Sequence, residues 1–328
     1  MPEPSPDAPG AVRRDSVFAG SGDIATEVSA IAHGDAHTIA TAADIQPGPS
    51  ADEVAERRLG TAFWIAAGFF LFVVALAILA PWLPIKDPSK IVGRPKLAPS
   101  GRFWFGTDAL GRDIFSRVIW GARPSLLVGF ASIVLGLIIG GPIGLLAGYL
   151  RKGYEAVLMT LMDVLLSFPA LLLAMAIVTF SGSKSELTVS IALGVVAIAP
   201  IARLVRANTM VYTQREFVTA ARSMGAGNLR IIVRDIIPNV IPSVISFSVI
   251  AVAVAIVAEG GLSFLGLSID AASKPTWGNM IVSGKPALEN GAPWISLIPS
   301  AVLFVTVLAL NLAGDRIREF TDIKGGDA

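Results

Sequence analysis

The chain has 328 residues, of which 53% are hydrophobic and only 16% are charged, whereas about a quarter of a typical soluble domain is charged. This composition excludes a single water-soluble globule, and the absence of cysteine excludes disulfide scaffolds, iron–sulfur clusters and cysteine nucleophiles. The net charge of +1 conceals a division: residues 1–56 hold ten acidic and two basic side chains, whereas residues 57–328 hold 15 acidic and 24 basic ones. An acidic segment therefore precedes a basic, apolar body.

Residues 1–56 are rich in Pro, Ala, Gly, Ser and Asp, a composition that buries too little apolar surface to offset the entropy of ordering. We expect a disordered acidic tail here, and the segment lacks the pattern of a secretory signal peptide. It holds both histidines of the chain, His33 and His37, four residues apart. No third ligand is near them, so we expect no metal site.

Six apolar runs follow, each close to the 20 or so residues that a helix needs to cross a bilayer. They cover residues 62–83, 124–149, 156–180, 188–208, 239–258 and 294–314. The pattern predicts an all-α polytopic membrane protein with six transmembrane helices. The six-span domain would occupy residues 57–322, and residues 323–328 would form a C-terminal tail.

Three long loops separate the runs, at residues 84–123, 203–237 and 259–293. If the N-terminus lies inside, the inner segments hold thirteen Lys and Arg residues and the outer segments hold eleven. Basic residues favour the inner side of a membrane, but a difference this small leaves the orientation open. The six arginines of residues 203–237 are the best argument for an internal N-terminus.

Four glycines recur every four residues in the second run. They are Gly136, Gly140, Gly144 and Gly148. Small residues at this spacing lie on one helix face and let two helix backbones approach closely. We therefore predict a helix-packing face, with a surface that slides during conformational change as the alternative.

Two further features adjoin the spans. Asp163 lies inside the third run, where an ionisable side chain is a functional hypothesis by default; we expect it to pair with a loop arginine, or else to belong to an ion pathway. Residues 111–120 read GRDIFSRVIW and place four apolar side chains on one face. This segment predicts a separate interfacial helix that anchors the first loop at the membrane surface.

The loop between the fourth and fifth runs predicts a short amphipathic helix. Thr213 and Glu216 form a T-x-x-E capping box, so the helix should begin near Gln214. Four residues at helical spacing form a narrow apolar ridge, and Gly225 should end the helix in a left-handed conformation. The ridge consists of Phe217, Ala220, Ala221 and Met224. Because two of the four are alanine, close contact with a partner protein is favoured over insertion into lipid.

The chain lacks the means to hydrolyse nucleotide. The segment GNMIVSGKP at 278–286 comes nearest to a phosphate-binding loop, but it has one residue too many between its glycines and has Pro286 in place of Ser or Thr. No nucleophile elbow, zinc-protease motif or paired-carboxylate constellation occurs in the sequence. We expect no catalytic residues and no enzymatic activity.

Four blocks in matching order resemble the permease subunits of ABC importers. The segment TAARSMGAGNLRIIVRDIIPN is similar to their "EAA" loop, with Ala220, Ala221 and Gly225 matching and Thr219 in place of the usual first acid. The C-type subunit of the dipeptide/oligopeptide/nickel branch is matched further, by FGTDALGRDIFSRVIWGARPSLLVG, GLSFLGLSIDAASKPTWGNMI and PW…PS…NLAGDRIRE. Together the blocks span about residues 60–322.

The resemblance implies the type I ABC-importer permease fold in the cell membrane, with both termini cytoplasmic and with the loops 84–123 and 259–293 on the extracytoplasmic side. It implies a homologous second permease subunit, one or two cytoplasmic ATPase subunits and an extracytoplasmic solute-binding lipoprotein as partners in the lipid bilayer. Nucleic acid would play no part. The chain itself would hold no cofactor, because ATP and Mg²⁺ would bind the ATPases.

The resemblance also assigns roles to residues. The EAA helix, with Glu216 and the ridge ending at Gly225, would be the coupling helix seated on an ATPase. Glu259, at the outer end of the fifth run, would cap structure there or contact a peptide. The chain would thus import di- or oligopeptides by alternating access. The alternatives are a nickel, glutathione or haem-like substrate, an ATPase-independent secondary transporter, and a scaffold membrane protein that does not transport.

Overall fold

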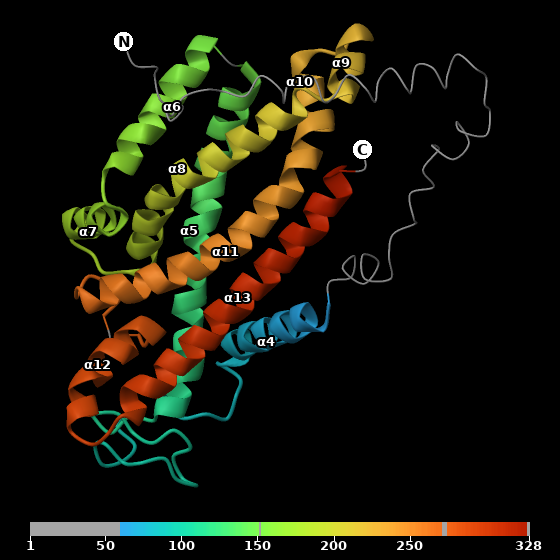
Figure 1. Cartoon of the computed structure of the whole chain (residues 1–328). Helices are drawn as coiled ribbons and strands as arrows, with labels where there is room; N and C mark the ends of the chain where they lie inside the picture. Colours follow the sequence, from blue (N-terminus) through green and yellow to red (C-terminus); the bar gives the residue numbers. More distant parts are fainter. Residues whose placement is uncertain (1–59, 151, 271–273, 327–328) are drawn as a thin grey trace, which may run out of the picture. The chain divides into compact units, whose positions relative to one another are not determined.

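The computed structural model describes residues 60–150, 152–270 and 274–326, and the described part of the chain is helical apart from its connecting loops (Figure 1). The predicted acidic tail of residues 1–56 and the two histidines lie outside the described residues. Across the described ranges the structure contains no strand, only an isolated bridge between Thr107 and Asp113. The all-α prediction is confirmed.

The helices follow in an order that matches the apolar runs, with differences at their ends. They are α4 (Gly60–Leu79), α5 (Ile114–Leu150), α6 (Lys152–Ser167), α7 (Ala170–Ser181), α8 (Glu186–Tyr212), α9 (Glu216–Ser223), α10 (Asn228–Ile231), the π-helical turn η2 (Ile232–Ile236), α11 (Ile237–Phe264), α12 (Trp277–Glu289) and α13 (Trp294–Gly326). The predicted tail from residue 323 begins as the last turn of α13.

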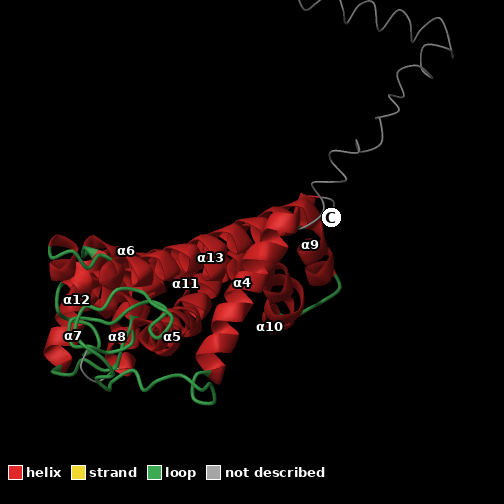
Figure 2. Ribbon diagram, turned by 90° about the horizontal axis from the view of Figure 1, so that it is seen from below, coloured by secondary structure: helices red, strands yellow, loops and turns green. Residues whose placement is uncertain are grey.

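Helix α5 lies at the centre of the described helices and packs mainly against α8, with α11 and α4 as further neighbours (Figure 1). The largest buried cluster joins residues of α5, α8 and α11, among them Leu126, Ile201 and Ile256, to Trp277 at the start of α12. Figure 2, seen from below, shows connecting loops gathered over one end of α5, α7, α8 and α12. The short helices α9 and α10 lie at the other end (Figure 1).

The third apolar run is not one straight span. It folds as α6 and α7, which meet at an angle of 84°. Pro169 is the N-cap residue of α7, and a proline disfavours helical geometry in the residue before it, here Phe168. In the described part of the chain, five helices are long and apolar enough to cross a membrane, and a sixth span results if this bent pair counts as one.

The predicted interfacial helix is wrong, because residues 114–120 form the first two turns of α5. Asp113 caps this helix: its Oδ2 accepts from the Ser116 amide at 3.0 Å. Arg112 and Arg117, which lie in the same segment, are 8% and 2% exposed. The polar face of this segment meets the folded first loop and not the solvent, which periodicity alone does not reveal.

The loop 259–293 is also more ordered than its length suggests. It contains the last turn of α11 and the whole of α12. Thr276 accepts a hydrogen bond from the Asn279 amide at 3.0 Å, and the Asn279 side chain accepts from the Thr276 amide at 2.9 Å. This reciprocal capping box starts α12 and leaves residues 265–276 as the connection to α11.

Candidate functional site

Helix α9 begins later than the sequence predicts, and the predicted capping box is absent. Helix α8 continues to Tyr212, so Thr213 becomes the residue that ends α8, and its hydroxyl donates to the Met210 carbonyl at 2.9 Å. Arg215 takes the N-cap position of α9 without a side-chain cap. The threonine is unavailable to α9 because the preceding helix extends beyond its apolar run.

The end of α9 follows a Schellman pattern. Gly225 has φ +82°, the left-handed conformation that the sequence analysis expects and that a side chain would strain. Its amide donates to the Arg222 carbonyl at 2.9 Å, and the Ala226 amide donates to the Ala221 carbonyl at 3.0 Å. These two bonds satisfy carbonyls at the helix end and turn the chain sharply into α10.

The four-residue ridge of α9 divides between two environments. Phe217 and Met224 are 42% and 82% exposed, and Ala220 is exposed between them. Ala221 is half-buried against the main core, next to Val218, which is fully buried. The apolar surface that this segment presents outward is therefore Phe217, Ala220 and Met224, whereas Ala221 and Val218 hold the helix to its own chain.

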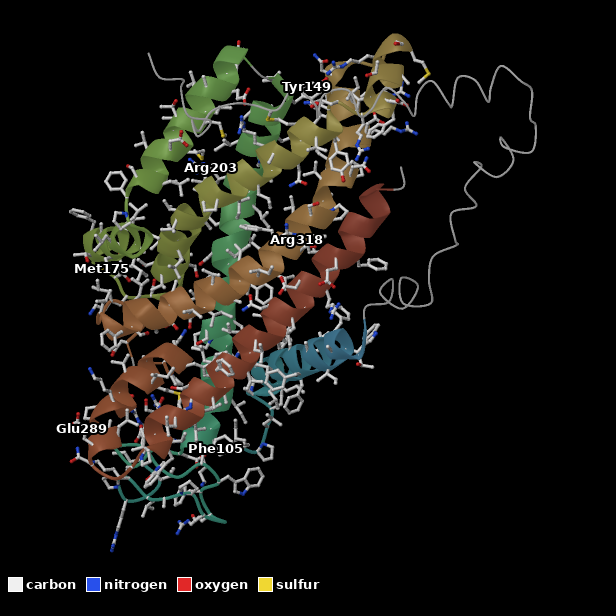
Figure 3. The ribbon with its side chains drawn as sticks, in the orientation of Figure 1. Phe105, Tyr149, Met175, Arg203, Glu289 and Arg318 are labelled. Carbon is white, nitrogen blue, oxygen red and sulfur yellow. The ribbon has the colours of Figure 1, made fainter. Side chains whose placement is uncertain are left out.

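Tyr149 connects the segment between α8 and α11 to α5. Its hydroxyl donates to Asn228 Oδ1, at the start of α10, over 2.7 Å, and the Arg222 guanidinium lies 5.7 Å from its ring centroid. Figure 3 shows Tyr149 beside the α9–α10 end of the structure. The sequence alone did not single out this residue. The available signal was its position at the end of an apolar run, because a tyrosine with an apolar ring and a polar hydroxyl suits the boundary between apolar and polar surroundings.

The glycine stripe of α5 faces α8. An added Cβ at Gly140 would lie 2.5 Å from the Ile198 carbonyl oxygen, and one at Gly144 would lie 2.2 Å from that of Ala202. Gly136 and Gly148 meet Ile201 and Thr209 in the same way. Neighbouring Gly141 has nothing within 4 Å. The two backbones therefore touch along the stripe and leave no room for a methyl group.

Two ion pairs join α6 to α8. Arg203 Nη2 lies 2.5 Å from Asp163 Oδ1, and Arg206 pairs with Glu155. The Asp163 and Arg203 side chains are 58% and 51% exposed, and Arg203 projects from α8 in Figure 3. They border an open cavity of about 640 Å³. Charges so exposed inside apolar helices are stable only beside water or a protein partner.

Glu259 is completely buried near the end of α11. Its Oε1 accepts hydrogen bonds from the hydroxyls of Ser263 (3.0 Å), Ser268 (2.5 Å) and Thr276 (2.9 Å). Its Oε2 has no hydrogen-bond partner and lies against the backbone of Gly278. The side chain joins α11 to the following loop and to Thr276, the N-cap residue of α12. This position favours the structural alternative over contact with substrate.

The first loop is folded around the buried charged side chains of Asp108, Arg112 and Arg117. Asp108 accepts from Arg112 Nε at 2.6 Å and lies 3.7 Å from Arg117 Nε, while Arg117 also donates to the Pro88 carbonyl at 2.9 Å. Gly111 has φ +82°, and a Cβ there would lie 2.3 Å from the Gly93 carbonyl oxygen. The TDALGRD sequence thus builds a compact loop against α5.

No group of three or more metal-ligating side chains lies within residues 60–150, 152–270 and 274–326. The arrangement offers no catalytic constellation of acid, base and nucleophile in these ranges. What it offers is an exposed apolar helix face at one end, a folded loop at the other, and closely packed helices between them.

Comparison with protein families finds a match over residues 140–322 to the family described as "Binding-protein-dependent transport system inner membrane component". Among similar proteins is the glutathione transport system permease protein GsiD of Pectobacterium atrosepticum, 39% identical over 79% of this chain and 86% of that protein. Another is the di/tripeptide transport system permease protein DppC of Pseudomonas aeruginosa, 40% identical over 78% of this chain and 86% of that protein.

Among solved structures, the fold is similar to that in crystals of the MetNI methionine ABC transporter in inward-facing conformations. The TM-score is 0.52 at 20% sequence identity, over 62% of this chain and 95% of the matched chain. A second crystal form of the same transporter gives a TM-score of 0.51 at 19% identity. At this identity the likeness concerns the fold alone.

Proposed function

The chain belongs to the family of binding-protein-dependent transport system inner membrane components, and from this premise we propose that it is the membrane-spanning permease subunit of an ATP-driven importer of short peptides. Two relatives near 40% identity support the substrate class, because one serves di- and tripeptide transport and the other serves glutathione, itself a tripeptide. The apolar helices of the chain form the conduit, and the energy comes from partner subunits.

The partners follow from what the chain lacks and from what it exposes. A second, homologous permease subunit completes the conduit, one or two ATPase subunits hydrolyse ATP, and an extracytoplasmic binding lipoprotein delivers the peptide. The face of Phe217, Ala220 and Met224 is the observation that carries this proposal. It is an exposed apolar ridge on a helix that is otherwise firmly attached to its own chain, as a docking helix must be.

Helix α9 acts as the coupling helix. Buried Val218 holds α9 to the core, and Arg222 of α9 lies over the ring of Tyr149 on α5. A displacement of α9 by the ATPases is therefore transmitted as rigid-body movement. The long helices then exchange inward-facing and outward-facing arrangements, a two-state transition of the hinge or shear kind. The end of the chain with α9 is cytoplasmic, as are both termini, and the loop 84–113 with α12 is extracytoplasmic.

Ala220→Arg tests the coupling assignment. Burying a bulky, charged side chain in a close-packed groove without an ionic partner is unfavourable. A cost of about 1.4 kcal/mol or more corresponds to a tenfold or greater loss of binding. Peptide uptake and peptide-stimulated ATP hydrolysis should therefore fall by tenfold or more. Ala220 is exposed, so membrane insertion should be unaffected, which Ala221→Arg would not guarantee.

Thr219→Arg is the matched control. Thr219 is also exposed on α9, but it lies about 100° around the helix from Ala220 and outside the ridge. It should retain most uptake. Full uptake by Ala220→Arg with a normally assembled complex would refute the coupling role, and uptake that survives loss of the ATPases' phosphate-binding lysine would indicate a secondary transporter.

Glutathione is a second candidate substrate, favoured by the GsiD relatives at 39% identity. Competition for uptake separates it from ordinary di- and tripeptides. Unlabelled glutathione and an unlabelled second dipeptide are each tested as competitors of a labelled dipeptide. If glutathione needs a far higher concentration to abolish uptake, the general peptide assignment holds. The opposite ranking would assign the chain to glutathione.

A further inference from the structure

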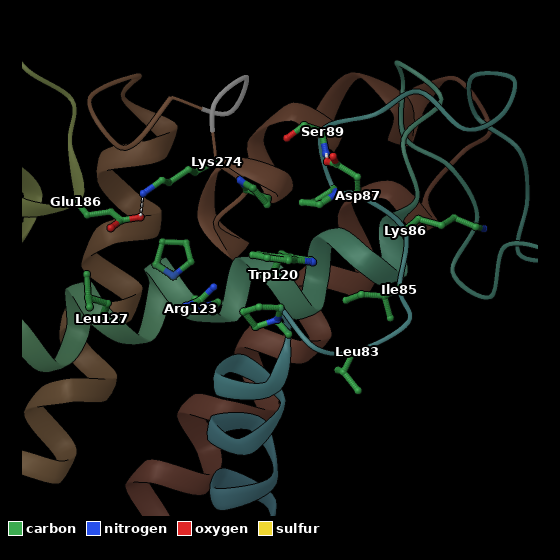
Figure 4. A pocket seen from close by; sticks show the side chains of 15 residues that line it. Leu83, Ile85, Lys86, Asp87, Ser89, Trp120, Arg123, Leu127, Glu186 and Lys274 are labelled. Carbon is green, nitrogen blue, oxygen red and sulfur yellow. Dashed lines mark hydrogen bonds and ion pairs between the residues drawn. The ribbon is translucent and has the colours of Figure 1, made fainter.

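A cavity of about 620 Å³ opens where the outer ends of several helices meet. The segment that follows α4, the N-terminal part of α5, the start of α8 and the loop before α12 line it. Figure 4 shows Trp120, Arg123 and Leu127 in order along α5, with Lys274 and Glu186 joined on one side and Asp87 and Ser89 of the first loop on the other. Its volume is typical of small-molecule sites.

The lining is divided into a polar and an apolar half. Arg123, Lys274, Glu186 and Asp87 supply charge, whereas Leu83 and Leu127 supply apolar surface. Lys86, also in the lining, is engaged elsewhere: its ammonium lies 4.0 Å from the centroid of the Phe103 ring and 3.6 Å from Asp113. The cavity is therefore amphiphilic, with its charge carried by groups on two sides.

Arg123 has no carboxylate partner among the residues that the structure describes. Its guanidinium lies 5.5 Å from the centroid of the Trp120 ring, which orients it without neutralising it. Lys274 pairs with Glu186 at 2.9 Å, but the lysine side chain is 60% exposed, so this pair is weak and easily exchanged. An anion entering the cavity would meet the Arg123 guanidinium and the Lys274 ammonium. The Asp87 carboxylate, also in the lining, accepts from the Ser89 amide at 2.9 Å and lies 3.6 Å from Lys90 Nζ.

The cavity also lies at a boundary between polar and apolar surface. On α5, the residues after Arg123 are apolar, and Leu127, Phe130 and Val134 are exposed at 52%, 42% and 50%. These three continue the face of Arg123 along the helix, since they recur every three or four residues. Tryptophan and arginine at the start of such a face are typical of a membrane–water interface. Their side chains place an apolar part against lipid and a polar end group in water.

We propose that this cavity binds the headgroup of a phospholipid of the outer leaflet. The phosphodiester accepts hydrogen bonds from the Arg123 guanidinium, whose planar fork suits two phosphate oxygens, and from the Lys274 ammonium. Glu186, relieved of Lys274, accepts the ammonium of a zwitterionic headgroup such as phosphoethanolamine. The acyl chains lie along Leu127, Phe130 and Val134.

A peptide carboxylate would satisfy Arg123 equally well, but it would leave the apolar face unused. A phospholipid matches both halves of the cavity and the exposed stripe that continues from it. The lipid would fix the first loop to the start of α8 and to the loop before α12, the elements that surround the cavity. This site does not depend on the nature of the transported solute.

Native mass spectrometry of the purified importer tests the proposal. After delipidation, 1-palmitoyl-2-oleoyl-phosphatidylethanolamine is added to the wild-type complex, to Arg123→Gln and to Lys285→Gln. Lys285 is an outer-side cation of α12 that lies over Phe264 and outside the cavity lining. The wild-type complex and Lys285→Gln should each retain one more phospholipid molecule than Arg123→Gln does. The affinity of Arg123→Gln for this phospholipid should be lower by a factor of about ten or more. Equal retention by all three complexes would overturn the site.

A second measurement does not depend on the stability of Arg123→Gln. Phosphatidylethanolamine with brominated acyl chains should quench part of the tryptophan emission of the wild-type complex saturably, and Trp120→Phe should lack that part. An unbrominated diglycosyl lipid, which has no phosphate, should not relieve this quenching. Competition by that lipid or by millimolar alanyl-alanine would overturn the phospholipid assignment, as would a cross-link from position 123 to the second permease subunit.

Discussion

At the scale of single residues, Glu259 has the most unusual environment in the described part of the chain. One oxygen of a fully buried carboxylate accepts three hydroxyl hydrogen bonds, while the other has none. Leaving a buried donor or acceptor without its partner costs about 1–3 kcal/mol. The three hydroxyls belong to the end of α11, the following loop and the N-cap of α12.

Glu259→Gln should be tolerated, because the amide oxygen can accept from the same three hydroxyls. Glu259→Leu should lower the thermal midpoint of the purified complex and its yield, since it leaves Ser263, Ser268 and Thr276 without their acceptor. Glu289→Gln, on the exposed end of α12, is the control and should match wild type. Equal midpoints for Glu259→Leu and Glu259→Gln would show that the hydroxyl cluster does not stabilise this region.

We expect the Tyr149 hydroxyl to contribute to the coupling between α5 and the α9–α10 segment. Tyr149→Phe keeps the ring beneath Arg222 but removes the 2.7 Å hydrogen bond to Asn228, a change of about 1 kcal/mol. The result should be weaker stimulation of ATP hydrolysis by substrate, with unchanged complex assembly. Tyr154→Phe is the matched control, because that side chain is 71% exposed; an identical loss in both variants would contradict the role of Tyr149.

At the scale of elements, the contact between α5 and α8 depends on the absence of side chains. A methyl group on Gly144 would lie 2.2 Å from a backbone carbonyl oxygen of α8, and backbone cannot move aside as the tip of a side chain can. Dispersion and close approach hold membrane helices together where lipid supplies no hydrophobic driving force. The interface therefore tolerates no added volume along the stripe.

Gly144→Ala and Gly141→Ala should have opposite effects. Gly144→Ala should separate α5 from α8 and reduce thermal stability by about 1–3 kcal/mol. Gly141→Ala has open space within 4 Å and should be neutral or stabilising by up to about 1 kcal/mol, because alanine favours the helix. Thermal unfolding of the detergent-solubilised complex measures both, and an unchanged midpoint in Gly144→Ala would disprove the close contact.

At the scale of the whole molecule, α9 and the folded first loop lie at opposite ends of the long helices (Figure 1). The chain has no cysteine, so single substitutions can report topology without background. Ala98 in the first loop and Ser223 on α9 are both exposed. Their accessibility distinguishes the proposed orientation from its inverse.

A membrane-impermeant maleimide applied to intact cells should label Ala98→Cys and leave Ser223→Cys unlabelled. After the membrane is permeabilised, both should react, which controls for buried or unreactive thiols. Labelling of Ser223→Cys in intact cells would place the α9 end outside and would exclude contact with cytoplasmic ATPases.

The sequence by itself determined the helical class, the approximate places of the spans and the glycine face of α5, because apolar length and residue spacing are local properties. It also predicted the left-handed end of α9 at Gly225, which depends on one residue that lacks a Cβ. Its family resemblance agrees with the match over residues 140–322. Its charge distribution could not orient the chain.

Which element each boundary residue belongs to, and which side chains become buried, depends on the tertiary structure. Thr213 ends α8 and so cannot cap α9, and the third run bends by 84° at Pro169. Arg112 and Arg117 belong to a buried network with Asp108 and not to a separate interfacial helix. The ridge of α9 likewise divides, with Ala221 inward and Ala220 outward. Each outcome depends on contacts between residues distant in sequence, and periodicity within one helix carries no information about what packs against it.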